Sequence, residues 1–138
     1  MSSPEDFNKR VIEEFRKNNG KVGGPFERFT LLLLHHKGAK SGEERVTPLV
    51  CKPRGNDFVI FASKAGADAH PAWFHNLVAN PDAKIEVGAE SLGVTARVAG
   101  PGEREEIWEP WKAEAPNFAE YEAKTKRTIP VVILERRG

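Results

Sequence analysis

Short apolar runs, separated by turns, limit most strongly what this chain can fold into. Six runs have the length and the flanking turn residues of strands: 29–36, 44–52, 58–62, 83–87, 90–98 and 130–135. Helical patterns do not alternate regularly with these runs, as they would in a doubly wound parallel sheet. The sequence therefore predicts an α+β fold that is mainly β, with antiparallel strands closing toward a barrel and helices packed on it.

Helices are expected at the start, in the middle and near the end of the chain. The expected helices are an N-terminal helix within residues 1–19, a short helix at 71–78, a helix at 103–114 and another that begins at Pro116. His70 is expected at the capping position of the second helix. A length of 138 residues fits one core, so we expect a single domain over 1–138 with a tail at 136–138.

Composition excludes several function classes. The net charge of +1 is too small to attract nucleic acid by the field of the whole protein. One cysteine, Cys51, allows no internal disulfide, and the spacing of the histidines completes no metal site. The polar first ten residues carry no signal peptide, and the longest apolar run is too short to span a membrane. We expect a cytoplasmic protein without metal.

The most informative local feature is the turn from Gly38 to Arg45, which joins two expected strands. Glycines let the backbone approach a ligand and point its amides inward. Ser41 adds a hydroxyl, and Lys40 and Arg45 add charge that suits a phosphate. A solvated strand-to-strand turn has a similar composition, so the spacing alone leaves both interpretations open. The order of residues is not that of a P-loop.

Three further features have both a structural and a functional interpretation. Ala62-Ser63-Lys64-Ala65-Gly66 follows a strand and could let a flat ring or a phosphate lie against the backbone. Trp73, on the helix 71–78, could stack on a ring or fill the core. Tyr121 is the only tyrosine, and its phenol could donate a hydrogen bond or a proton to a reacting group.

Taken in order, several segments resemble the deazaflavin-dependent nitroreductase family, whose members bind coenzyme F420. The resemblance covers roughly residues 7 to 136. It is carried by Gly20 to Phe26, Gly38-Ala-Lys-Ser-Gly42 with Arg45-Val-Thr-Pro-Leu49, Ala62-Ser-Lys64, His70-Pro-Ala-Trp73 through Asn76-Leu77, Ala79-Asn80-Pro81, Tyr121 and Arg127-Thr-Ile-Pro130. No single segment is specific, but their ordered combination is.

This resemblance implies a split β-barrel of the flavin-reductase type and an enzyme that transfers a hydride from reduced F420 to a quinone, an activated alkene or a nitroaromatic. The implied catalytic residues are Ser63 and Tyr121. The implied cofactor-binding residues are Lys40, Ser41, Gly42, Arg45, Thr47, Pro48, Ala62, Ser63, Lys64, Ala65, Trp73 and Asn76. A homodimer and peripheral contact with a membrane are both compatible with this picture.

The chain also departs from the family pattern. His35-His36-Lys37 replaces a threonine-rich strand end, and Ala115 and Phe118 stand where some relatives have tyrosines. These departures bear on the substrate more than on the cofactor. Two other interpretations stay open: a protein that stores F420 without catalysis, and a split barrel that binds FMN or haem.

Overall fold

The computed structural model describes residues 4–23 and 29–137 of the chain. The helices are α1 (Pro4–Lys17), α2 (Ala72–Ala79), α3 (Pro101–Glu114) and α4 (Pro116–Lys124), with a 3-10 turn, η2, at Lys64–Gly66. The strands are β1 (Thr30–Lys37), β2 (Glu44–Arg54), β3 (Asp57–Phe61), β4 (Asp82–Val87), β5 (Glu90–Val98) and β6 (Val131–Arg136). Within the described ranges, no helix combines the length and the apolarity that a membrane span requires.

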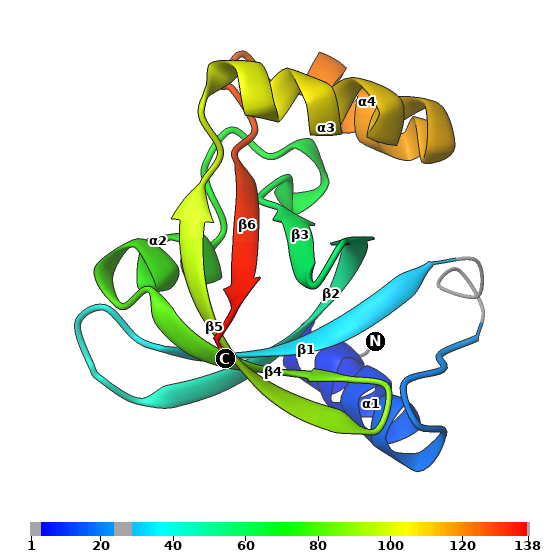
Figure 1. The fold of residues 1–138 in the computed structure, drawn as a ribbon, viewed down its shortest axis with the longest axis vertical. Coiled ribbons are helices and arrows are strands. Elements are labelled where there is room, and N and C mark those ends of the chain that lie inside the picture. The colour runs from blue at the N-terminus through cyan, green and yellow to red at the C-terminus, as the bar shows by residue number, and fades with distance from the viewer. Residues whose placement is uncertain (1–3, 24–28, 138) are drawn as a thin grey trace.

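The six strands form a closed barrel in the order β1-β2-β3-β6-β5-β4, and every neighbouring pair is antiparallel. Three pairs are hairpin neighbours in sequence, and β6 returns from the end of the chain to lie between β3 and β5. Figure 1 shows α3 and α4 together beyond one end of the barrel and α1 on the opposite side. The expected antiparallel barrel with attached helices is confirmed.

Strand β1 is buried on both faces. Side chains alternate across a strand, so Leu32 and Leu34 point into the barrel while Leu31 and Leu33 point outward. The outward pair is covered by α1, whose Val11 and Phe15 are buried against it. The continuous leucine run therefore reflects a strand between the barrel core and a helix.

A second apolar layer joins α3 and α4 to the outer face of β3 and β6. The indole of Trp108 is fully buried there, and its N–H donates to a Glu122 carboxylate oxygen at 2.5 Å. Phe61 stacks on Trp111 with ring centroids 4.8 Å apart, and Phe118 packs edge-on against Trp111. This layer fixes α4, and with it Tyr121, relative to the end of β3.

The closed ring of strands has a gap on one side of β2, where β2 and β3 pair over only part of their length. Strand β3 pairs with β2 only over Cys51 to Arg54, whereas β1 pairs with β2 from Glu44 to Cys51. The first half of β2 therefore has a free edge on the β3 side. Pro48, which has no backbone N–H to offer, lies on this edge, where proline is tolerated.

Most element boundaries agree with the expected ones, and one local expectation is wrong. Pro71, in extended conformation, precedes α2 as its N-cap residue, and no side chain caps this helix. His70 instead accepts a hydrogen bond from Arg127 through Nδ1, at 2.9 Å. The structural interpretation of Ala62 to Gly66, a turn, is confirmed, and this turn is the 3-10 turn η2. The segment Gly24 to Phe26, which belongs to the family resemblance, lies outside the described residues.

Candidate functional site

A cavity of about 460 Å³ opens beside the free edge of β2. One wall comes from that edge, one from the segment that follows β3, and one from α4. Its lining consists of Phe29, Pro48, Leu49, Val50, Phe61, Ser63, Lys64, Pro71, Trp73, Asn117, Phe118 and Tyr121. Five residues that the sequence assigns to the site thus meet around one space: Pro48, Ser63, Lys64, Trp73 and Tyr121.

Aromatic and apolar side chains dominate this cavity, and a few polar groups interrupt them. Trp73 is buried in the barrel core, which confirms its structural interpretation. It also lines the cavity, and stacking on a ring stays a prediction. Asn117 donates from Nδ2 to the Tyr121 hydroxyl oxygen at 3.3 Å, which leaves the phenol proton free to donate elsewhere. Such a pocket, mostly apolar with a small number of placed polar groups, is typical of a small-molecule site.

The polar wall is a tightly held loop. Lys64 has φ +45°, in the left-handed region that residues other than glycine seldom occupy, and strain of this kind concentrates at functional sites. Arg127, which is distant in sequence, holds this loop in place by hydrogen bonds. Its guanidinium donates to the Ser63 carbonyl (2.9 Å), the Ala67 carbonyl (2.8 Å) and the His70 ring (2.9 Å). The position of Lys64 therefore depends on Arg127.

Gly66 joins the same loop to α4. It has φ +84°, and a Cβ atom there would lie 2.9 Å from the Tyr121 carbonyl oxygen. We expect Gly66→Ala to lower the free energy of unfolding by about 2–3 kcal/mol, because backbone strain adds to a clash with backbone. Urea denaturation measures this loss.

Gly55→Ala is the matched control for that substitution. Gly55 has φ +63°, and no atom lies within 4 Å of its added Cβ. This variant therefore carries the backbone strain without the clash. Equal losses in the two variants would mean that the loop and α4 are not in tight contact.

The turn between β1 and β2 lies beside the cavity and not in its lining. Its backbone closes through Gly42 N–H to the Gly38 carbonyl and Gly38 N–H to the Glu43 carbonyl, both at 2.9 Å. The Ser41 hydroxyl accepts from the Glu43 amide at 3.2 Å and so serves the turn itself. Lys40 and Arg45 are exposed, and no carboxylate of the described residues forms an ion pair with either.

Arg45 and Pro48 are on the same strand, three residues apart. A strand rises about 3.3 Å per residue, so the two positions are separated by about 10 Å. A cofactor with a ring in the cavity and an anionic group on a flexible chain could reach both. The structure therefore gives the predicted residues two neighbouring locations, the cavity and the turn.

A buried polar network lies between these two locations. Asn76 accepts the Ala39 amide proton through Oδ1 and donates from Nδ2 to His36 Nδ1, both at 2.9 Å. His36 Nε2 is 2.9 Å from the Thr47 hydroxyl. Burial, with the positive charges of Arg45 and His35, lowers the pKa of His36 to about 4. Thr47 and Asn76, both expected at the site, thus use these atoms within the protein.

Ala62 and Ala65 are the two remaining residues of this segment that were expected at the cofactor. Ala62 is fully buried in the barrel core, and its amide donates to the Pro130 carbonyl. Ala65 forms the middle of η2, and its side chain is outside the description. Ala62 does not line the cavity.

Sequence reasoning did not identify several residues that matter here. Asn117 lies four residues before Tyr121 on α4, and this helical spacing was a usable signal for a side-chain pair. Arg127 belonged to the family pattern, but nothing in the sequence indicated that it binds a loop 60 residues away. His36 was noted only as a departure from the family.

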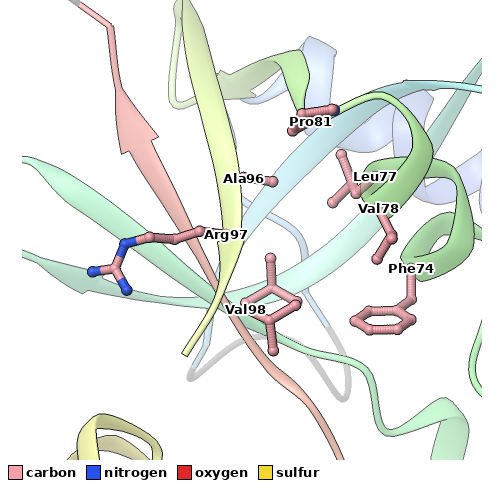
Figure 2. A pocket seen from close by; sticks show the side chains of 8 residues that line it. Phe74, Leu77, Val78, Pro81, Ala96, Arg97 and Val98 are labelled. Atoms are coloured by element: carbon pink, nitrogen blue, oxygen red, sulfur yellow. The ribbon is translucent and has the colours of Figure 1, made fainter. Parts of the chain in front are cut away.

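A second cavity, about 210 Å³, lies between α2 and β5 (Figure 2). Phe74, Leu77, Val78, Pro81, Ala96, Val98 and Val132 contribute apolar side chains to it. The Arg97 guanidinium points away from this space in Figure 2 and pairs with Glu103 and Glu135. The second cavity thus lacks a placed donor for an anion, and the first is the better candidate.

Comparison with known proteins agrees with this geometry. The chain is 39% identical over 127 residues to a Mycobacterium tuberculosis protein named F420H(2)-dependent quinone reductase, covering 89% of this chain and 85% of that one. It resembles a solved structure described as an F420-H2 dependent reductase, FDR-A, with 39% identity, a TM-score of 0.69, and coverage of 76% of this chain and 93% of that one.

A second solved structure, described as a domain-swapped dimer, is 35% identical, with a TM-score of 0.72 over 96% of this chain and all of the other. The haem storage protein HutZ from Vibrio cholerae is similar in fold alone, at 12% identity and a TM-score of 0.59 over 95% of this chain and 91% of that one. Both similarities extend over nearly the whole chain and support the split-barrel assignment.

The match to a family model decides the assignment. Residues 8–136 match the model described as F420H(2)-dependent quinone reductase. The expected class, oxidoreductase, and the expected cofactor, coenzyme F420, are thereby confirmed. The chain belongs to the F420H(2)-dependent quinone reductase family.

Proposed function

We propose that this protein reduces a quinone with F420H2, and that the reaction takes place in the 460 Å³ cavity beside β2. The observation that carries the proposal is the meeting of two sets of residues there. Ser63 and Lys64 follow β3 and Trp73 lies on α2, whereas Phe118 and Tyr121 lie on α4. A flat acceptor between them would have a polar wall and an aromatic wall.

The residues present suit the chemical groups of F420. Its ring system would lie against Trp73 and Pro48, where the lining is apolar and flat. Lys40 and Arg45 would hold its phosphate at the turn, where they are exposed without an ion-pair partner among the described residues. Lys64, exposed at the cavity edge, would meet the carboxylates of its glutamate tail.

When bound, reduced F420 supplies the hydride, and the protein supplies position and electrostatics. Two electrons and one proton reach the quinone with the hydride, and one further proton completes the hydroquinone. A donor near the carbonyl oxygen lowers the barrier, because negative charge develops there. The Tyr121 hydroxyl has a free proton, and the Ser63 hydroxyl makes no hydrogen bond to another described residue.

The activity assay follows oxidation of F420H2 by menadione with and without the protein. We expect strong acceleration, and a lower kcat in Tyr121→Phe, which lacks only the hydroxyl that we assign as donor. Activated alkenes and nitroaromatics are tested beside quinones. Tight binding of F420 without turnover of any acceptor would identify a storage protein instead, and preference for FMN over F420 in parallel titrations would contradict the site assignment.

Three further points belong to this proposal. The domain-swapped relative supports a homodimer for this chain, which sedimentation tests directly. We place the protein in the cytoplasm, since its one cysteine is a free thiol, as is usual where thiols stay reduced. We also propose that residues 1–138 form one domain, since all six strands belong to one barrel.

A further inference from the structure

We propose that His36 is a positioning residue for cofactor binding: through Asn76, its neutral ring holds the turn Gly38–Gly42 in place. The inference rests on the proposed phosphate site at that turn. His36 contacts neither the cavity nor the exposed face of the turn, so it would act only through its neighbours.

Apart from the paired strands β1 and β2 that it joins, the turn has one hydrogen bond to the rest of the described protein. Backbone hydrogen bonds within the turn close the loop. In the described part of the chain, a single hydrogen bond links residues 38–42 to another element: the Ala39 amide donates to Asn76 Oδ1 at 2.9 Å. Asn76 lies on α2 and is 7% exposed. The anchor is therefore a buried amide whose orientation matters.

Donor and acceptor rules fix every member of this network. The Ala39 amide can only donate, so the carbonyl oxygen of Asn76 must face it. The Asn76 amide nitrogen, which also only donates, then faces His36 Nδ1. His36 must accept there, so its proton is on Nε2, which donates to the Thr47 hydroxyl oxygen. A proton on Nδ1 would bring two donors together.

Charged neighbours favour the same neutral state. Arg45 lies opposite His36 in the register of β1 with β2, and His35 precedes it on β1. His35 itself is bound between Glu44 and Glu86, with ring-to-carboxylate distances of 2.9 and 2.6 Å. From α2, the group that faces His36 is the uncharged Asn76. A neutral His36 thus places no further positive charge against Arg45, which we assign to the phosphate together with Lys40.

Two substitutions separate positioning from packing. Asparagine places an acceptor near the position of Nδ1, whereas glutamine reaches the position of Nε2. We expect His36→Asn to keep the affinity for F420 within about threefold, because it can still accept from Asn76. His36→Gln should weaken it about tenfold, the effect of one buried hydrogen bond. The KM for F420H2 should rise in His36→Gln while kcat at saturation stays unchanged.

The ring state of His36 is measured in the wild-type protein without cofactor. Nitrogen chemical shifts should show a protonated Nε2 and an unprotonated Nδ1 at pH 7. A proton on Nδ1 would overturn the inference, and this measurement decides the matter if His36→Gln does not fold. His36→Gln binding F420 as tightly as wild type would also overturn it. The proposed phosphate site would survive either result, since it is tested separately, by the variants of Lys40 and Arg45.

Discussion

Replacing both Lys40 and Arg45 by alanine is expected to weaken F420 binding by about 100-fold. A charge-assisted contact with a phosphate contributes about 1.5–3 kcal/mol, and the exposure of both side chains places them at the lower end of that range. Two such contacts give about 3 kcal/mol, which corresponds to the stated change in Kd. Calorimetric titration at low and high salt measures it, and the salt dependence should be weaker in the double variant.

The control removes the same charge elsewhere. Lys17 on α1 and Arg136 on β6 are exposed and lie outside both the turn and the cavity lining. The variant Lys17→Ala with Arg136→Ala should bind F420 like the wild type. If the two double variants lose affinity equally, the effect is one of net charge, and the turn is not the phosphate site.

Arg127→Ala is expected to disrupt both stability and cofactor binding. The substitution leaves the carbonyls of Ser63 and Ala67 and the ring of His70 without their donor. Water can replace part of these bonds, so we expect a loss of about 3 kcal/mol, or roughly 10 °C in Tm. Lys64, which needs support in its left-handed conformation, should relax away from the cavity, and the Kd for F420 should rise more than tenfold.

Arg127→Lys tests the geometry of that prediction. Lysine keeps the charge but cannot donate from a planar fork to three acceptors. Thermal melts and F420 titrations should therefore place this variant between wild type and Arg127→Ala. Full recovery in Arg127→Lys would show that charge alone is required, and an unchanged Arg127→Ala would show that the loop is held by other contacts.

Much of the fold was predictable because its elements are signalled locally. Glycine, proline and asparagine mark the hairpin ends, and the strand pattern between them gave boundaries that differ from the observed ones by a few residues. The family resemblance supplied the split-barrel class. The turn at η2 was expected, but the left-handed conformation of Lys64 was not, because a lysine gives no sequence signal for it. The cap of α2 was misassigned because His70 is engaged by Arg127, far away in sequence.

Part of the candidate site was likewise predictable from the sequence, and part of it was not. The cavity residues Ser63, Lys64, Trp73 and Tyr121 were predicted from ordered motifs. The role of Asn76 was not, because its amide bonds to Ala39 and His36, and a pattern of residue types does not show hydrogen-bond direction. Contacts over long sequence separation decide such roles, and only the folded arrangement displays them.

The leucine run of β1 has a consequence for how the chain folds. Leu31 to Leu34 are buried on both faces, so sliding β1 by one residue against β2 would still bury leucines on either side. Burial of apolar side chains therefore distinguishes only weakly between the native and the slipped register of β1 and β2. The length of the turn between these strands must fix the register instead. The segment that we assign to phosphate would then also set the alignment of the first hairpin. Insertions in the turn between β1 and β2 should therefore cause misfolding, and not only weaker cofactor binding.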